Sequence, residues 1–182
     1  MTLPTIKERH RKLAWLANFL SDLPHSRFHM PEWASKDATE TSCGSAGCAC
    51  GWAATVFNRE GWSLSKLGIP LAPSEYESEE VELTVKNRGK FHHIPGPAVS
   101  FAVFFGISIE DSIDITCNLD SLASAFPFGG LVDKPCYLKE YGVSPRNITP
   151  MMAADRIRKI LRTIDPEALE EVSKPQYELI EA

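Results

Sequence analysis

The chain has 182 residues, of which 43% are hydrophobic and 24% charged, and its formal net charge is −5. This composition is typical of a soluble globular protein and excludes a chain that is disordered throughout. The negative total argues against a general nucleic-acid binder, because neutralising phosphates requires a concentrated basic surface. The longest apolar run starts at Pro97 and has about half of the ~20 residues that a membrane span requires.

The N-terminal segment carries charges where a secretory signal peptide would need an apolar stretch, among them Lys7, Glu8 and Arg9. We therefore expect a cytoplasmic protein. In that reducing compartment the five cysteines are mainly thiols, and their odd number argues against a complete disulfide framework.

The first predicted element is a helix that begins near Pro4 and stops before Pro24. Its apolar positions recur at helical spacing, and they are Ile6, Leu13, Leu16, Leu20 and Leu23. We expect residues 25–42 to form a loop whose aromatic side chains cover the end of the core. A second, apolar helix should start near Ser45 and end at about Phe57.

The middle of the chain carries a strand pattern. Apolar and polar residues alternate from Val81 to Val85, and residues 91–94 follow a glycine-containing turn as a possible return strand. The sequence therefore predicts a small β-hairpin at about 81–94. Because two strands alone are marginally stable, this hairpin should lean on helices.

Further helices are expected over residues 97–106, 109–117 and 149–164, with a short one after Pro166. Ser108 followed by Asp111 resembles a capping box, and Thr149 with Pro150 is typical of a helix start. We therefore predict a mainly α protein, with about five to six helices and the hairpin in a single domain over residues 1–175. Residues 176–182 would form a C-terminal tail.

The stretch TSCGSAGCACGW, at 41–52, has a composition that favours several kinds of chemistry. Cys43, Cys48 and Cys50, with His29 as a fourth ligand, would make a small zinc-binding module. The C-x4-C-x-C spacing speaks against zinc, because structural sites usually combine two short ligand pairs. A disulfide between Cys43 and Cys48 fits the turn geometry but not a reducing compartment.

The same stretch also permits nucleophilic catalysis. If Cys48 or Cys50 lies in the first turn of the helix, the helix dipole favours its thiolate. His92 or His93 would then serve as the base of a cysteine-dependent hydrolase or transferase. We favour a competing interpretation, in which the stretch packs in the core. Its glycines and alanines have small side chains that leave space on one face of the helix, and Trp52 fills that space.

A two-part motif carries a resemblance to known proteins. It consists of Arg27-Phe28-x-Met30-x-x-Trp33 and Cys43-Gly44-Ser45-x-x-Cys48-x-x-Gly51-Trp52. This pattern resembles a widespread group of small phage, prophage and bacterial proteins that carry R-[FY]-[DN]-M-x-x-W followed by C-G-[TS]-x-x-C-[IA]-x-G-[WH]-A. The chain departs from that pattern at His29. The resemblance implies a helical fold and a phage or prophage setting, and it brings no known activity. We expect no cofactor, and a location in the host cytoplasm if a phage encodes the protein.

The function expected from this setting is binding. We expect a non-enzymatic phage-type accessory protein that binds a host protein or a small, nucleotide-like signalling molecule, for example in counter-defence. The candidate contact residues are Lys7, Arg9, Arg11, Lys12, Arg27, His29 and Trp33. Nucleic-acid binding through the basic cluster, by which we mean Lys7, Arg9, Arg11 and Lys12, is a weaker alternative. No membrane contact is expected. The sequence leaves the oligomeric state open.

Overall fold

The computed structural model describes residues 3–28, 48–65, 70–87, 96–116, 140–143 and 147–172. The described part is mainly helical with one small two-stranded antiparallel sheet, which confirms the predicted fold class. Its α-helices are α1 (Ile6–Asp22), α2 (Ala49–Val56), α3 (Glu77–Asn87), α4 (Gly96–Phe105), α5 (Ile109–Thr116), α8 (Pro150–Ile164) and α9 (Glu167–Glu171). The short elements are the 3-10 turns η1 (His25–Arg27), η3 (Asn58–Glu60) and η4 (Ser74–Tyr76), and the strands β1 (Ser63–Leu64) and β2 (Pro70–Leu71).

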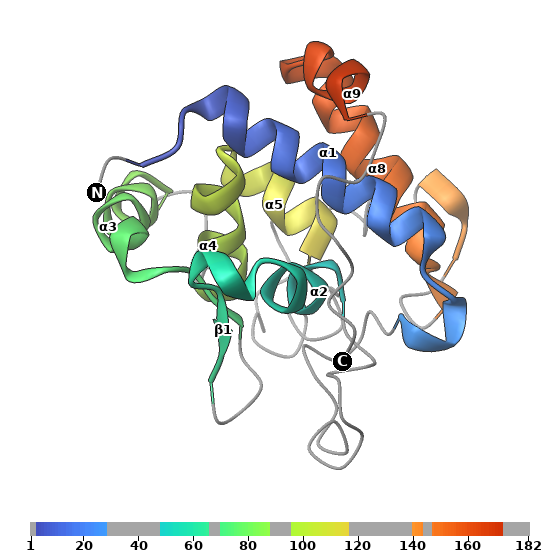
Figure 1. Ribbon diagram of the computed structural model, residues 1–182, viewed down its shortest axis with the longest axis horizontal. Helices are drawn as coiled ribbons and strands as arrows, with labels where there is room; N and C mark the ends of the chain where they lie inside the picture. The colour runs from blue at the N-terminus through green and yellow to red at the C-terminus, as the bar shows by residue number, and fades with distance from the viewer. Residues whose placement is uncertain are drawn as a thin grey trace.

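The long helix α1 is the element around which the others pack (Figure 1). Helix α8 lies alongside α1 and forms the most extensive contact between described elements, and α9 also packs against α1. Helix α4 packs against α5 and touches α1, α2 and α3. Helix α3 lies at one edge of the molecule, where it contacts α4 and η4.

Side-chain caps mark the starts of α1, α5 and α8, and the sequence predicts the last two of them. The Thr149 hydroxyl accepts a hydrogen bond from the Met152 amide at 3.2 Å at the start of α8. The Ser108 hydroxyl accepts one from the Asp111 amide at 3.0 Å at the start of α5. Helix α1 is capped by Thr5, which forms a capping box with Glu8.

The predicted hairpin at 81–94 is wrong in its first half, because residues 81–87 belong to helix α3. Val81 and Val85 stand four residues apart and lie on the exposed side of that helix, whereas Leu83 is half-buried. The acidic residues in the first turn of α3 favour a helix, since they complement the positive end of its dipole. Residues 91–94 lie outside the described residues. The observed sheet pairs β1 with β2, with Ser63 opposite Leu71 and Leu64 opposite Pro70.

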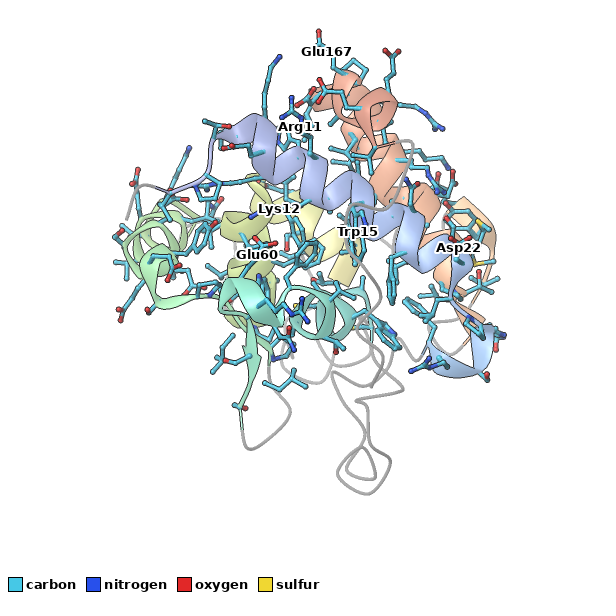
Figure 2. The ribbon with its side chains drawn as sticks, viewed as in Figure 1. Arg11, Lys12, Trp15, Asp22, Glu60 and Glu167 are labelled. Carbon is cyan, nitrogen blue, oxygen red and sulfur yellow. The ribbon has the colours of Figure 1, made fainter. Side chains whose placement is uncertain are left out.

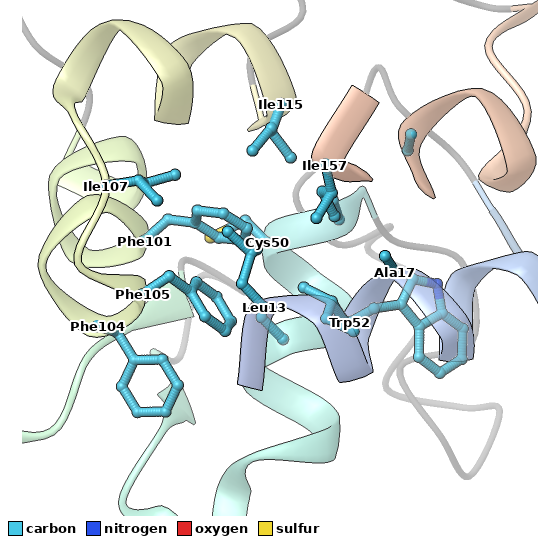
Figure 3. Packing of buried hydrophobic residues seen from close by; sticks show 14 of the residues in the cluster. Leu13, Ala17, Cys50, Trp52, Phe101, Phe104, Phe105, Ile107, Ile115 and Ile157 are labelled. Carbon is cyan, nitrogen blue, oxygen red and sulfur yellow. The ribbon is translucent and has the colours of Figure 1, made fainter. Parts of the chain in front are cut away.

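The core contains a cluster of aromatic rings between α1, α2 and α4. Phe104 is its centre: its ring lies 4.9 Å from that of Phe105, 5.2 Å from Trp62, 5.4 Å from Phe57 and 5.5 Å from Tyr76, between centroids. Edge-to-face and tilted geometries dominate, which is the arrangement that ring quadrupoles prefer. Leucines of α1 and isoleucines of α5 and α8 close the core around these rings (Figure 3).

Candidate functional site

The basic residues near the start of α1 each meet a carboxylate of another element. The ion pairs are Lys7–Glu167, Arg9–Glu79, Arg11–Glu171 and Lys12–Glu60. Figure 2 shows Lys12 beside Glu60, and Arg11 on the side of α1 that faces α9. Carboxylates from distant segments therefore compensate cations that the dipole of α1 would disfavour. The sequence groups these cations as candidate contact residues, and the structure uses their charge to join α1 to α3, η3 and α9.

Arg9 is the most deeply placed of these cations, with a side chain that is only 5% exposed. Its guanidinium donates to both carboxylate oxygens of Glu79, at 2.7 and 3.0 Å, and to the Val103 carbonyl at 2.9 Å. Its Nε donates to the Pro4 carbonyl at 3.0 Å, and its plane lies 5.0 Å from the Tyr76 ring centroid. The hydrogen bond with Glu79 raises the pKa of Arg9. This side chain therefore has almost no surface left for an external partner.

His10 forms a second buried connection, between α1, the end of α4 and the end of α8. Its Nδ1 lies 2.9 Å from Asp165 Oδ2, and its Nε2 lies 3.2 Å from the Gly106 carbonyl oxygen. An ionised carboxylate and a carbonyl can only accept, so both hydrogen bonds form together only when both ring nitrogens carry a proton. The hydrogen bond from His10 lowers the pKa of Asp165. The geometry is that of a buried His–Asp contact, which is an ion pair when the ring carries both protons.

The two described cysteines of the motif are buried, Cys48 at 1% and Cys50 at 0% exposure. Helix α2 begins at Ala49, later than the predicted start near Ser45, and Cys48 is its N-cap residue without a capping side-chain bond. Burial raises the pKa of the Cys48 thiol, so the helix dipole does not produce a reactive thiolate here. The Cys50 thiol lies 3.5 Å from the Pro97 carbonyl, to which it donates, and Figure 3 places it beside Phe101 in the core. Both side chains pack as small apolar groups.

The remaining predicted ligands and bases cannot be placed around these cysteines. Cys43, His29, His92 and His93 lie outside the described residues. Within the described ranges, no group of three or more His, Cys, Asp or Glu side chains is arranged to hold a metal ion.

Arg27 belongs to the second group of predicted contact residues, together with His29 and Trp33. Its guanidinium lies 5.2 Å from the Trp52 ring centroid, and its carbonyl accepts a hydrogen bond from Trp52 Nε1 at 3.1 Å. These contacts fasten η1 to α2 and join the two parts of the motif. Trp33, like His29, lies outside the described residues.

Helix α8 carries a polar network that the sequence analysis missed. Arg156 pairs with Asp114 and Glu140, and Lys159 pairs with Glu140 and Asp155. The Tyr141 hydroxyl donates to Asp155 Oδ2 at 2.6 Å. Burial, supported by this hydrogen bond, raises the pKa of Tyr141 to about 12, so the phenol stays protonated at neutral pH. The network thus has the properties of a structural clamp, and not of an activated nucleophile.

The outer face of α3, by which we mean Glu75, Glu77, Val81, Glu82 and Val85, combines exposed apolar side chains with charge that is unpaired within the described ranges. The two valines are 60% and 59% exposed, the most exposed large apolar side chains of the described part. The three carboxylates are exposed as well, and no ion pair within the described ranges involves them. The prediction of a strand over residues 81–85 hid the fact that acidic residues flank an apolar stripe here.

Comparisons with known proteins returned no match among protein-family models, curated proteins or solved structures. Among the helices of the described ranges, none combines the length and the apolar character that crossing a membrane demands.

Proposed function

We propose that the protein acts by binding another protein, as an accessory protein of phage or prophage type that engages a protein of its bacterial host. The observation that carries this proposal is the outer face of α3, where Val81 and Val85 are exposed beside carboxylates that are unpaired within the described part. Exposed apolar residues bordered by charged ones are typical of interaction sites. The phage setting rests on the two-part motif.

A small anionic ligand, such as a signalling nucleotide, has less support. Its phosphates need cations or free backbone amides, and the cations of the α1 cluster are engaged by carboxylates. The open charge on α3 is negative and would repel phosphate. A protein partner is therefore the better match to the surface.

The cysteine-dependent hydrolase has less support still. Cys48 and Cys50 are buried in the core, and the thiol pKa of Cys48 is raised. A cysteine nucleophile must be accessible to its substrate and must be ionised to the thiolate. Burial opposes both the access and the ionisation.

Site-specific photo-crosslinking in bacterial cells tests the proposal. Benzoylphenylalanine would replace Val81 on α3 or, as the control, Met151, which is 53% exposed on α8. We expect a discrete adduct with one cellular protein from position 81 and none from position 151. The absence of any adduct from both positions would argue against a protein-binding function. A nucleotide released on denaturing the purified protein would favour the small-ligand alternative.

A further inference from the structure

We infer that the outer face of α3 receives a basic, amphipathic helical segment of the partner, an inference that rests on the proposed function. Three features of the surface carry it: the geometry of the valine stripe, the sign of the surrounding charge, and the engagement of the chain's own basic cluster elsewhere.

The exposed residues of α3 form a stripe along the helix. Glu77, Val81 and Val85 follow one another at intervals of four residues, so their side chains lie one above the other on the same face. Ser78 and Glu82 form the adjacent row. A partner helix that presents apolar side chains at positions i, i+3 or i+4, and i+7 matches such a stripe, because its own side chains repeat at the same period.

The negative charge around the stripe favours a partner segment of positive charge. Glu75 and Glu77 lie where α3 begins, and Glu82 flanks the valines, while Lys86 in the last turn is the one basic residue of the helix. None of the three carboxylates has an ion pair within the described ranges. A segment with lysine or arginine beside its apolar positions would pair with them, which favours association and fixes its orientation.

The contacts that hold α3 to the rest of the protein lie on its inner side. Glu79 turns inward to Arg9, and Leu83 and Asn87 also face the body of the protein. The outward carboxylates make no comparable contact within the described part. Within that part, nothing prevents them from pairing with a partner.

A second copy of this chain is a poor candidate for the partner. Its basic cluster on α1 is already paired with Glu167, Glu79, Glu171 and Glu60. Offering those cations to α3 of another copy would break the contacts that join α1 to α3, η3 and α9. The basic cluster of α1 is therefore not the segment that α3 would receive, and a different protein is the better source.

A synthetic peptide tests the chemistry without knowledge of the natural partner. The probe is a fluorescein-labelled helical peptide of about 18 residues, with leucines on one stripe and lysines beside them, because that length spans α3 with margin. Two control peptides keep the leucine stripe with glutamates in place of the lysines, or keep the composition in scrambled order. Binding is measured by fluorescence anisotropy at low and at high salt.

We expect the basic amphipathic peptide to bind and both control peptides to fail. Replacing the valines (Val81→Ser with Val85→Ser) should weaken binding about tenfold, since two apolar contacts are lost. Replacing the carboxylates (Glu77→Gln with Glu82→Gln) should weaken it and flatten its salt dependence. The matched control on α8, Met151→Ser with Ile164→Ser, removes two exposed apolar side chains elsewhere and should leave affinity unchanged.

Three outcomes of the peptide experiment would overturn the inference. They are no binding of the basic peptide, equal loss of binding in the α8 control, and dimerisation of the protein that the valine substitutions abolish. An adduct in the cross-linking experiment that forms from position 151 alone would also refute this site, although protein binding itself would stand. The complete absence of adducts bears on the proposed function instead, so the two failures are distinguishable.

Discussion

Asp165→Asn should destabilise the protein far more than Glu167→Gln, which also replaces a carboxylate by an amide. The Asp165 carboxylate lies 2.9 Å from His10, and the two side chains are 11% and 7% exposed. Asparagine keeps the shape and can still accept from Nδ1, but the charge pairing is lost. The neutral ring then cannot donate to both Asp165 and the Gly106 carbonyl.

The expected magnitude follows from these contacts. A charge-assisted hydrogen bond contributes about 1.5–3 kcal/mol, and an unpaired buried carbonyl adds to the loss. We therefore expect the free energy of unfolding to fall by about 2–3 kcal/mol. For a chain of this size, each kcal/mol lowers the melting temperature by about 2–4 °C. Urea denaturation at pH 7 and thermal melts followed by circular dichroism would measure both quantities.

Glu167→Gln is the matched control. Glu167 also faces a basic residue of α1 at 2.9 Å, but both Glu167 and Lys7 are about two-thirds exposed. Water screens such a pair, so we expect no resolvable change in stability. If Glu167→Gln cost as much as Asp165→Asn, or if Asp165→Asn cost nothing, the argument that burial gives the His10 pair its strength would be refuted.

The pH dependence of stability gives an independent test of whether the Asp165 carboxylate stabilises the folded protein. Because the pKa of Asp165 is lowered by His10 in the folded protein, its carboxylate adds stability above the unfolded pKa, near 3.8. That contribution is lost as the pH falls through the lower folded pKa. The stability difference between the wild type and Asp165→Asn should therefore shrink below about pH 4. A difference that grew below about pH 4 would contradict the stabilising role assigned to the Asp165 carboxylate.

Three further predictions concern the core and one turn. A variant that keeps only Cys48 and Cys50 should resist a thiol reagent while folded and react fully in denaturant; fast reaction in the folded state would revive the thiol-enzyme alternative. Phe104→Ala should lower the free energy of unfolding by about 3–5 kcal/mol in urea titrations, because it empties the centre of the aromatic cluster. Gly106→Ala should cost at least about 1–2 kcal/mol, since Gly106 has a φ of +68° and the new Cβ would lie 3.0 Å from Ile6 Cδ1. Gly96→Ala, where an added Cβ meets nothing within 4 Å, should cost little, and equal losses at both glycines would show that the turn geometry is unimportant.

Helix starts could be predicted from the sequence because capping is local. Ser108 lies three residues from Asp111, and Thr149 lies three residues from the Met152 amide that it accepts from. The information therefore lies within one turn of the chain. The same locality explains the error at α3. The alternation from Val81 to Val85 fits a strand, yet the same two valines also fit the helical interval of four, and a short window cannot decide between the two periods.

The partners of the basic cluster could not be read from local patterns, because they lie far away in the sequence. Glu79 is separated from Arg9 by 70 residues, and Glu167 from Lys7 by 160. The sequence nonetheless contained one indication that α9 contacts α1. Lys7 and Arg11 stand four residues apart, as do Glu167 and Glu171, so two helices with these pairs can match charge to charge. Such complementary spacing indicates a possible contact, but only the fold shows which helices meet.

The pairing of Arg9 also explains how α3 comes to present its valines outward. A helix turns by about 100° per residue, so fixing the direction of one side chain fixes the direction of all the others. Arg9 is locked in the core by the Val103 and Pro4 carbonyls, and it takes Glu79 with both oxygens. With Glu79 directed inward, Val81 and Val85 must face away from the body of the protein. The sequence suggested Arg9 as a contact residue. In the structure Arg9 is buried, and it acts indirectly by orienting the α3 surface that we propose for the partner.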